Sequence, residues 1–167
     1  MSTTALIGLG ANLGDPVHML ETCLGALIPL SCDARLQVSG LYKSAPVDAD
    51  GPDYFNAVAS LSTHLEPMAL LQALQTIENL AGRVRSHINA PRTLDLDLLL
   101  FGKLQMSTEV LSLPHPRMHQ RAFVLRPLLD LGLAQWVIPP FGTVEQLETQ
   151  TRDQRIEKLP TDLQIRL

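Results

Sequence analysis

The feature that most constrains the fold is the leucine-rich run LDLDLLLF at residues 94–101, which carries two aspartates. The run has the length of a buried strand and is too short for a typical helix. Side chains alternate between the two faces of a strand, so the helix-facing side is expected to carry Leu94, Leu96, Leu98 and Leu100. Asp95 and Asp97 then share the opposite face, with Cα atoms roughly 6.5 Å apart.

The rest of the chain supplies partners for this strand. Apolar periodicity and turn residues predict further strands at 4–9, 34–43 and 54–63, and helices from 16 to about 30 and from 67 to 82. Gly10 and Gly14 are expected to form a turn beside the site. The order strand, helix, strand, strand, helix, strand is typical of an α+β, ferredoxin-like fold. We therefore expect a largely antiparallel sheet with helices on one face and substrate loops on the other.

Composition narrows the class of protein. The 167 residues are 46% hydrophobic and 18% charged, which predicts one globular domain over residues 1–167. No apolar run spans a bilayer, the N-terminus lacks signal-peptide features, and the two cysteines form no disulfide framework. These features favour a cytoplasmic protein without a membrane partner. The net charge of −4 argues against nucleic acid.

Arginines are concentrated around the aspartate-bearing strand. They are Arg83, Arg85, Arg92, Arg117, Arg121 and Arg126. Each alone is best explained as part of a solvated surface, and two neighbouring aspartates alone are a weak motif. Together, carboxylates suited to Mg²⁺ and arginines suited to phosphate indicate a phosphoryl-transfer site.

Two other segments offer binding groups. Alternation along 54–63 turns Tyr54 and Asn56 away from the core, where a ring and an amide can hold a flat heterocycle. His115 and His119 have the spacing of a zinc pair, but Pro116 follows His115 and no catalytic glutamate lies between them, so zinc is disfavoured. His115 and Arg121 are instead expected to contact phosphate.

Several motifs together resemble one family. ALIGLGANLGDP, LYKSAPV, PDYFNAV, IENLAGRVR, APRTLDLDLLLFG and LPHPRMHQRAFVLRPL, in this order, are similar to the 6-hydroxymethyl-7,8-dihydropterin pyrophosphokinases of folate biosynthesis. The resemblance runs to about residue 131. It implies a ferredoxin-like, ATP-dependent diphosphotransferase whose substrates are ATP and the reduced pterin. The enzyme is expected to act as a monomer and to release AMP.

The resemblance also implies roles for residues. Asp95 and Asp97 would hold two Mg²⁺ ions, and Arg83 and Arg92 would be catalytic. The nucleotide side would comprise Gln75, Glu78, Arg85, Ser112, His115 and Arg121. The pterin side would comprise Ser44, Pro46, Val47, Tyr54, Asn56, Asn89 and Phe123. The loop tryptophan of the family is missing here, and Asn89 stands in that part of the loop.

Two other classes of function remain open on the residues alone. One is a noncatalytic ferredoxin-like binding module, in which the charged residues form a surface. The other is a metal-dependent hydrolase that uses His115, His119 and the aspartates. Formation of AMP that requires both Mg²⁺ and the reduced pterin distinguishes the pyrophosphokinase from both.

Overall fold

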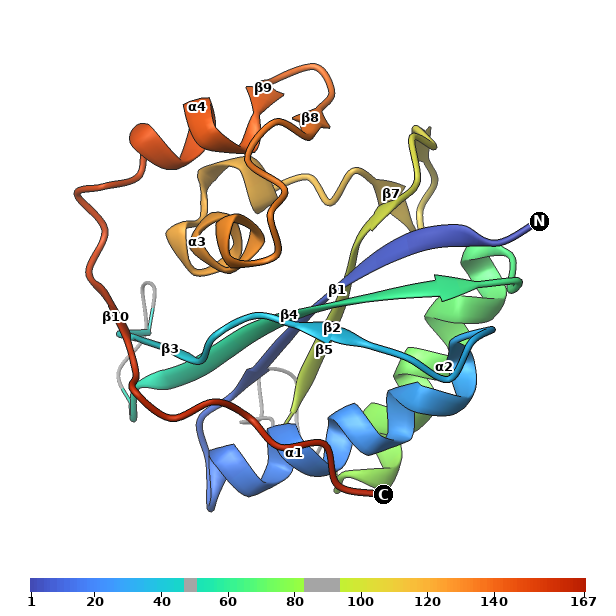
Figure 1. Ribbon diagram of the computed structural model, residues 1–167, viewed down its shortest axis with the longest axis horizontal. Helices are drawn as coiled ribbons and strands as arrows, with labels where there is room; N and C mark the ends of the chain where they lie inside the picture. The colour runs from blue at the N-terminus through green and yellow to red at the C-terminus, as the bar shows by residue number, and fades with distance from the viewer. Residues whose placement is uncertain (47–50, 83–93) are drawn as a thin grey trace.

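The leucine-rich run forms strand β5 (Asp95–Phe101) at one edge of a six-stranded antiparallel sheet (Figure 1). The computed structural model describes residues 1–46, 51–82 and 94–167. The sheet order is β10-β3-β4-β1-β5, with β2 also paired to β4. Its other strands are β1 (Thr3–Ala11), β2 (Gln37–Val38), β3 (Tyr42–Ser44), β4 (Tyr54–Thr63) and β10 (Ile156–Lys158). Two small pairs lie outside it: β6 (Met106–Ser107) with β7 (Ser112–Leu113), and β8 (Val137–Ile138) with β9 (Gly142–Thr143).

Helices lie on both sides of this sheet (Figure 1). They are α1 (Pro16–Leu27), α2 (Pro67–Leu80), α3 (Ala122–Asp130) and α4 (Val144–Thr149), with short 3₁₀ turns η1 (Ile28–Leu30) and η2 (Met118–Gln120). The predicted helices after Pro16 and Pro67 are confirmed, and in both the proline occupies the first turn. No helix in the described ranges is long and apolar enough to cross a membrane.

The expectation that helices cover only one face is wrong. Leucines of β5 and the helices α1 and α2 form one core, whose members include Leu20, Leu24, Leu70, Leu74, Leu96 and Leu98. A second core lies on the other face, where α3 packs on the sheet and α4 packs on α3. The reason is an apolar patch on that face, formed by Leu6, Val58, Leu99 and Leu100. Among the described residues, α3 therefore covers part of this face, and the rest of the face remains open to ligands.

The alternation predicted for β5 holds for Asp95 through Leu98 and fails at Leu100. The register with β1 shifts between Leu6 and Ile7, so Leu6 pairs with Leu100 and Ile7 with Leu98. Leu99 is the extra residue of this β-bulge. Leu99 lies on the face of the aspartates, as alternation predicts. Because of the bulge, Leu100 joins it in the second core, and Phe101 packs in the first core.

The strand expected at 34–43 is two short strands, β2 and β3. Ser39 interrupts the run: its backbone N–H donates to the carbonyl of Val58 at 2.9 Å, and its Oγ accepts from the Val58 N–H at 2.9 Å. Asp130, at the end of α3, stabilises the segment between β2 and β3 through two hydrogen bonds. Its Oδ2 accepts from the backbone N–H of Gly40 at 3.1 Å and from the Tyr42 hydroxyl at 2.8 Å.

Asp130 is therefore expected to stabilise the contact between α3 and the sheet. Asp130→Ala should lower the free energy of unfolding by roughly 1–3 kcal/mol, because the Tyr42 hydroxyl and the Gly40 N–H lose their acceptor. Tyr42 is only 1% exposed, so its hydroxyl has little access to water. Urea unfolding measures the loss. Asp130→Asn, which keeps an acceptor oxygen, should lose less, and equal losses in the two variants would contradict this role.

The C-terminal tail, which showed no clear pattern in sequence, adds strand β10 to the sheet beside β3. It then continues onto α1 (Figure 1), where Glu21 accepts from the backbone N–H of Gln164 at 2.6 Å and from the Arg166 guanidinium at 3.2 Å. Gly25 leaves the space for this contact, since a Cβ there would collide with the carbonyl of Arg166. The tail thus contacts an edge of the sheet through β3 and one of its faces through α1.

Candidate active site

Two glycines of β1 form the floor of the site. Across the β1–β5 ladder, Gly10 lies opposite Asp95 and Gly8 lies opposite Asp97. On the other side of β1, Gly10 also lies opposite Asn56 of β4. Asn56 and Asp95 are two strands apart, which is roughly 10 Å at the backbone. A ligand can therefore lie across the glycines with the amide at one end and the carboxylates at the other.

This arrangement corrects one expectation about the glycines. Gly14 lies in a turn with φ of 64°, as predicted, whereas Gly10 lies within strand β1. A side chain at position 10 would crowd the site, because its Cβ would lie 3.3 Å from Asn56 Oδ1. Gly10 is therefore part of the site's floor.

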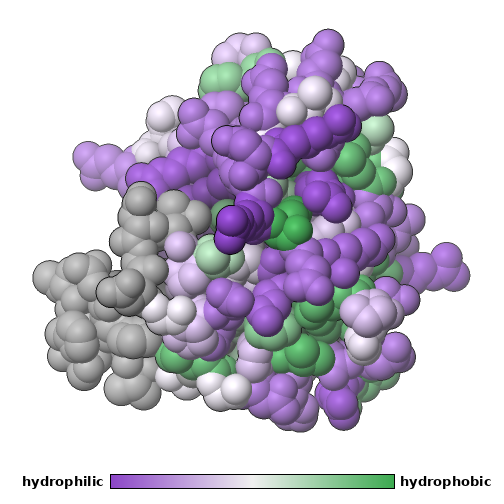
Figure 2. Space-filling view, turned by 90° about the vertical axis from the view of Figure 1, so that its left-hand side faces the viewer, coloured by the Kyte–Doolittle hydropathy of each residue, from purple (hydrophilic) through white to green (hydrophobic). Residues whose placement is uncertain are grey.

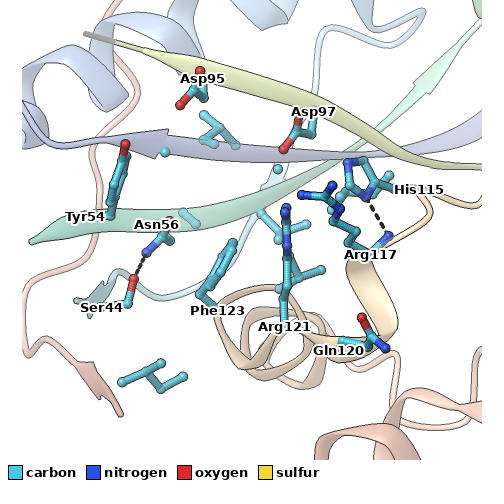
Figure 3. Close-up of a pocket in the computed structure, with 18 of the residues that line it drawn as sticks. Ser44, Tyr54, Asn56, Asp95, Asp97, His115, Arg117, Gln120, Arg121 and Phe123 are labelled. Atoms are coloured by element: carbon cyan, nitrogen blue, oxygen red, sulfur yellow. Dashed lines mark hydrogen bonds between the residues drawn. The ribbon is translucent and has the colours of Figure 1, made fainter. Parts of the chain in front are cut away.

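A cavity of about 1010 Å³ lies above this floor (Figure 3). Asp95 and Asp97 extend into it from β5, and Tyr54 and Asn56 extend into it from β4. Phe123 of α3 lines it from the opposite side. The side-chain directions predicted for Tyr54, Asn56 and both aspartates are therefore confirmed.

The amide of Asn56 is held in a fixed orientation. Its Nδ2 donates to the Oγ of Ser44 at 2.8 Å, and both residues are buried (Figure 3). Among the described residues, the other N–H and the Oδ1 of this amide make no further hydrogen bond, so both can pair with a ligand. Such an arrangement can recognise the edge of a heterocycle that offers both a donor and an acceptor.

Basic side chains surround Asp97. Burial lowers the pKa of the Arg121 guanidinium, while the negative charge of Asp97 acts to raise it. Burial likewise lowers the pKa of His115, again with Asp97 opposing and with Arg121 and Arg117 adding to the decrease. Arg121 Cζ also lies 5.4 Å from the centre of the Phe123 ring. This end of the cavity thus combines positive charge with an aromatic surface.

His115 is held in one tautomer. Its Nδ1 accepts a hydrogen bond from the backbone N–H of Arg117 at 3.1 Å (Figure 3). In the neutral imidazole the proton then resides on Nε2, which can donate to an anionic ligand. The lowered pKa of His115 favours this neutral form.

A second cavity of about 300 Å³ adjoins the first. Its lining comes from α2, β5 and the segment around β7, and includes Leu71, Thr108, Val110, Leu111 and Ser112. Asp97, His115 and Pro116 line both cavities. A carboxylate and an imidazole therefore stand where the two spaces meet.

The other predicted nucleotide residues lie farther along α2. Gln75 and Glu78 line neither cavity, but they follow Leu71 at helical spacings of four and seven residues and share its side of the helix. Glu78 is 5% exposed, and its charge adds to the burial that raises the pKa of the Cys23 thiol to about 12. Pro46 is half-buried just beyond β3. The predicted residues that lie outside the described ranges are Val47, Arg83, Arg85, Asn89 and Arg92.

Two residues singled out in the sequence have other neighbours. The ring of His119 stacks on Phe141, with centroids 3.5 Å apart, rather than lining the cavity with His115. Arg126 lies over the Tyr42 ring at 5.7 Å. Among the arginines of the described ranges, Arg117 and Arg121 line the larger cavity, and so does Arg155 of the tail.

Some cavity residues were not expected from the sequence. They are Gly8, Gln120, Gln154, Arg155 and Ile156. Gly8 could have been found, because it lies within the strand predicted at 4–9, where alternation places Leu6 and Gly8 on the same face. The tail residues follow no recognisable pattern, since their place depends on the pairing of β10 with β3.

Asp95 and Asp97 fit a Mg²⁺ site in their chemistry. Mg²⁺ in nucleotide enzymes commonly takes one or two carboxylates and completes its shell with phosphate oxygens and water. The two aspartates present oxygen ligands on one side of β5, facing the cavity, and both are half-buried (Figure 3).

The family model described as 7,8-dihydro-6-hydroxymethylpterin-pyrophosphokinase (HPPK) matches residues 6–133. The chain belongs to this family. The matched range contains the glycine floor, both aspartates and the segment from His115 to Phe123. It ends before Gln154 and β10, so the tail contacts lie beyond the matched range.

Individual relatives agree with this assignment. The chain is 43% identical over 157 residues to 2-amino-4-hydroxy-6-hydroxymethyldihydropteridine pyrophosphokinase of Haemophilus influenzae, covering 93% of this chain and 98% of that protein. It is 42% identical over 155 residues to the protein of the same name in Pseudomonas aeruginosa, covering 92% of this chain and 95% of that protein.

A solved structure shares the fold. A Plasmodium falciparum HPPK-DHPS triple mutant superposes with a TM-score of 0.70 at 16% identity, covering 90% of this chain and 43% of that chain. This chain therefore spans less than half of that longer chain. At this identity the likeness concerns the fold alone.

Proposed function

We propose that this HPPK-family chain transfers pyrophosphate from MgATP to the hydroxymethyl group of 6-hydroxymethyl-7,8-dihydropterin and releases AMP, as a step of folate biosynthesis. The observation that supports this most directly is the meeting of two cavities at Asp97 and His115. A transfer between two substrates needs two binding spaces that share the place of reaction.

The larger cavity suits the pterin. Asn56, oriented by Ser44, can pair with the edge of the heterocycle, and Tyr54 and Phe123 supply aromatic surfaces. Pro46, Val47 and Asn89 complete the proposed pterin side on the basis of the family resemblance. The smaller cavity suits the nucleotide, with Ser112 and His115 in its lining. Gln75, Glu78, Arg85 and Arg121 complete the proposed nucleotide side.

In this reaction the pterin hydroxyl oxygen bonds to the β-phosphorus of ATP. The bond from that phosphorus to the α,β-bridging oxygen breaks, AMP leaves with that oxygen, and the hydroxyl proton is released. Neutral His115 can donate its Nε2 proton to a phosphate oxygen, and Arg121 can pair with phosphate charge. Asp95 and Asp97 would hold Mg²⁺, which neutralises phosphate charge when bound. Arg83 and Arg92 are proposed to meet the charge that develops during transfer.

Further features of the protein are proposed with the function. The order β3-β4-β1-β5, with α1 and α2 as the connections on one face, supports a ferredoxin-like description of the sheet. Because both cores share this sheet, we propose a single domain over residues 1–167. Binding of two Mg²⁺ ions, a monomeric state and a cytoplasmic location are proposed on the family resemblance and the sequence.

The decisive assay is AMP formation from ATP. We expect AMP to appear only when both Mg²⁺ and the reduced pterin are present, together with pyrophosphorylated pterin in equal amount. A noncatalytic binding module would form no AMP. A hydrolase would consume ATP without the pterin. Either of these results would overturn the proposed function.

A further inference from the structure

Gln154, in the tail between α4 and β10, bonds to the backbone on both sides of Arg121. Its Oε1 accepts a hydrogen bond from the N–H of Ala122 at 2.9 Å. Its Nε2 donates to the carbonyl of Gln120 at 2.7 Å. A single amide from the tail thus holds the two peptide groups that flank Arg121.

The backbone at this point needs outside partners. Arg121 is extended, with φ of −116° and ψ of 110°, between the 3₁₀ turn η2 and helix α3. The first N–H groups of a helix have no partner within the helix, and the Arg121 side chain does not cap α3. Gln154 supplies the acceptor for Ala122, the first residue of α3, from 32 residues away in the sequence.

The orientation of Arg121 matters to the cavity. The residue is half-buried there, and the negative charge of Asp97 attracts its guanidinium. The guanidinium carbon also lies 5.4 Å from the centre of the Phe123 ring (Figure 3). An arginine held in place before its ligand arrives loses less conformational freedom on binding. Gln154 of the tail fixes the backbone on both sides of Arg121, so the orientation of the Arg121 side chain depends on this contact.

We propose that Gln154 is a positioning residue that holds Arg121 ready for the phosphates of the nucleotide. This inference rests on the proposed function, in which Arg121 contacts those phosphates. The tail enters the site here: Gln154, Arg155 and Ile156 all line the larger cavity. Figure 2 faces the side over which the tail passes and shows a mostly hydrophilic surface with smaller hydrophobic areas. Gln154 is exposed, and through the backbone it acts on a side chain that lines the cavity.

A double-mutant cycle tests the inference. The four proteins are the unchanged chain, Gln154→Ala, Arg121→Ala and the double variant. Calorimetry measures the Kd of α,β-methylene-ATP with Mg²⁺ for each. Gln154→Ala should raise this Kd roughly three- to tenfold, the range expected for losing hydrogen bonds that orient a charged group. In the Arg121→Ala background the same change should have little further effect, because the group it positions is gone.

Two further variants separate hydrogen bonding from other effects. Gln154→Met keeps the length of the side chain without its amide, so it should raise the Kd as Gln154→Ala does. Gln150→Ala removes an exposed glutamine four residues earlier whose side chain makes no hydrogen bond to the described residues, and it should leave the Kd unchanged. Thermal unfolding of each variant identifies the temperature range in which all are folded.

The possible outcomes are distinct. An equal rise in Kd in both backgrounds would show that Gln154 does not act through Arg121. An unchanged Kd in Gln154→Ala, with a raised Kd in Arg121→Ala, would overturn the role of Gln154 and leave that of Arg121. An unchanged Kd in Arg121→Ala would overturn the proposed phosphate contact and the inference with it. AMP formation by the unchanged chain tests the overall function separately.

Discussion

Replacing Asp97 by asparagine is expected to lower kcat by about a hundredfold or more. Asp97 faces both cavities, and its carboxylate is one of two proposed Mg²⁺ ligands on β5. The amide of asparagine is nearly the same size but carries no charge, so it is a poor substitute as a metal ligand. Asp95→Asn is expected to have an effect of the same order. Steady-state AMP formation at saturating substrates measures both changes.

The control must match the change in charge. Asp162→Asn removes one negative charge from an exposed position in the tail and should leave kcat unchanged. Thermal unfolding of Asp97→Asn should stay close to that of the unchanged chain, because the variant removes one of two neighbouring like charges. Binding of Mn²⁺ in the presence of the ATP analogue, followed by electron paramagnetic resonance, should weaken. Near-normal kcat in Asp97→Asn would remove the carboxylate pair from the proposed reaction.

Asn56→Ala should weaken pterin binding roughly ten- to a hundredfold while leaving nucleotide binding nearly unchanged, since an unpaired buried polar group costs about 1–3 kcal/mol. Asn56 is 5% exposed and is oriented by its bond to Ser44. A ligand edge that pairs with this amide would lose its partner in a place that water reaches poorly. Calorimetry of pterin binding, with the unreactive ATP analogue present, measures the loss.

Ser44→Ala provides a graded comparison. It retains the amide of Asn56 but removes the oxygen that orients it, so its effect on pterin affinity should be smaller than that of Asn56→Ala. Equal nucleotide affinity in the two variants checks that the smaller cavity is intact. If pterin affinity were unchanged in Asn56→Ala, the heterocycle would have to bind elsewhere.

Local alternation was sufficient to predict the strands that carry the central site residues. Asp95, Asp97, Tyr54 and Asn56 face the cavity because each lies in a strand whose opposite side is apolar. The same rule failed at Leu100, because the bulge at Leu99 depends on pairing with β1 and leaves no signal in β5 alone. Alternation therefore predicts one strand well until its partner imposes a change of register.

Long-range contacts explain what the sequence did not predict. Strand β10 has three residues and is defined by pairing with β3, more than a hundred residues earlier in the chain. The two hydrogen bonds of Gln154 to the backbone beside Arg121 come from a single side chain. Glutamine is common on protein surfaces, so its presence in the tail gave no signal of this contact. Helix α3 could have been placed on the second face, because Val124, Leu125 and Leu128 give it an apolar side that needs cover.

The glycine floor has a consequence for inhibitors and for resistance to them. A molecule that rests on Gly8 and Gly10 touches main-chain atoms, which no substitution can remove. A substitution there can only add atoms: a methyl group at Gly10 would stand 3.3 Å from Asn56 Oδ1, and one at Gly8 would stand 3.4 Å from Leu99 Cδ1. Such an addition would crowd the natural substrate as much as the drug. Compounds that take most of their contact from this floor should therefore select resistant variants less readily than compounds that depend on side chains at the cavity rim.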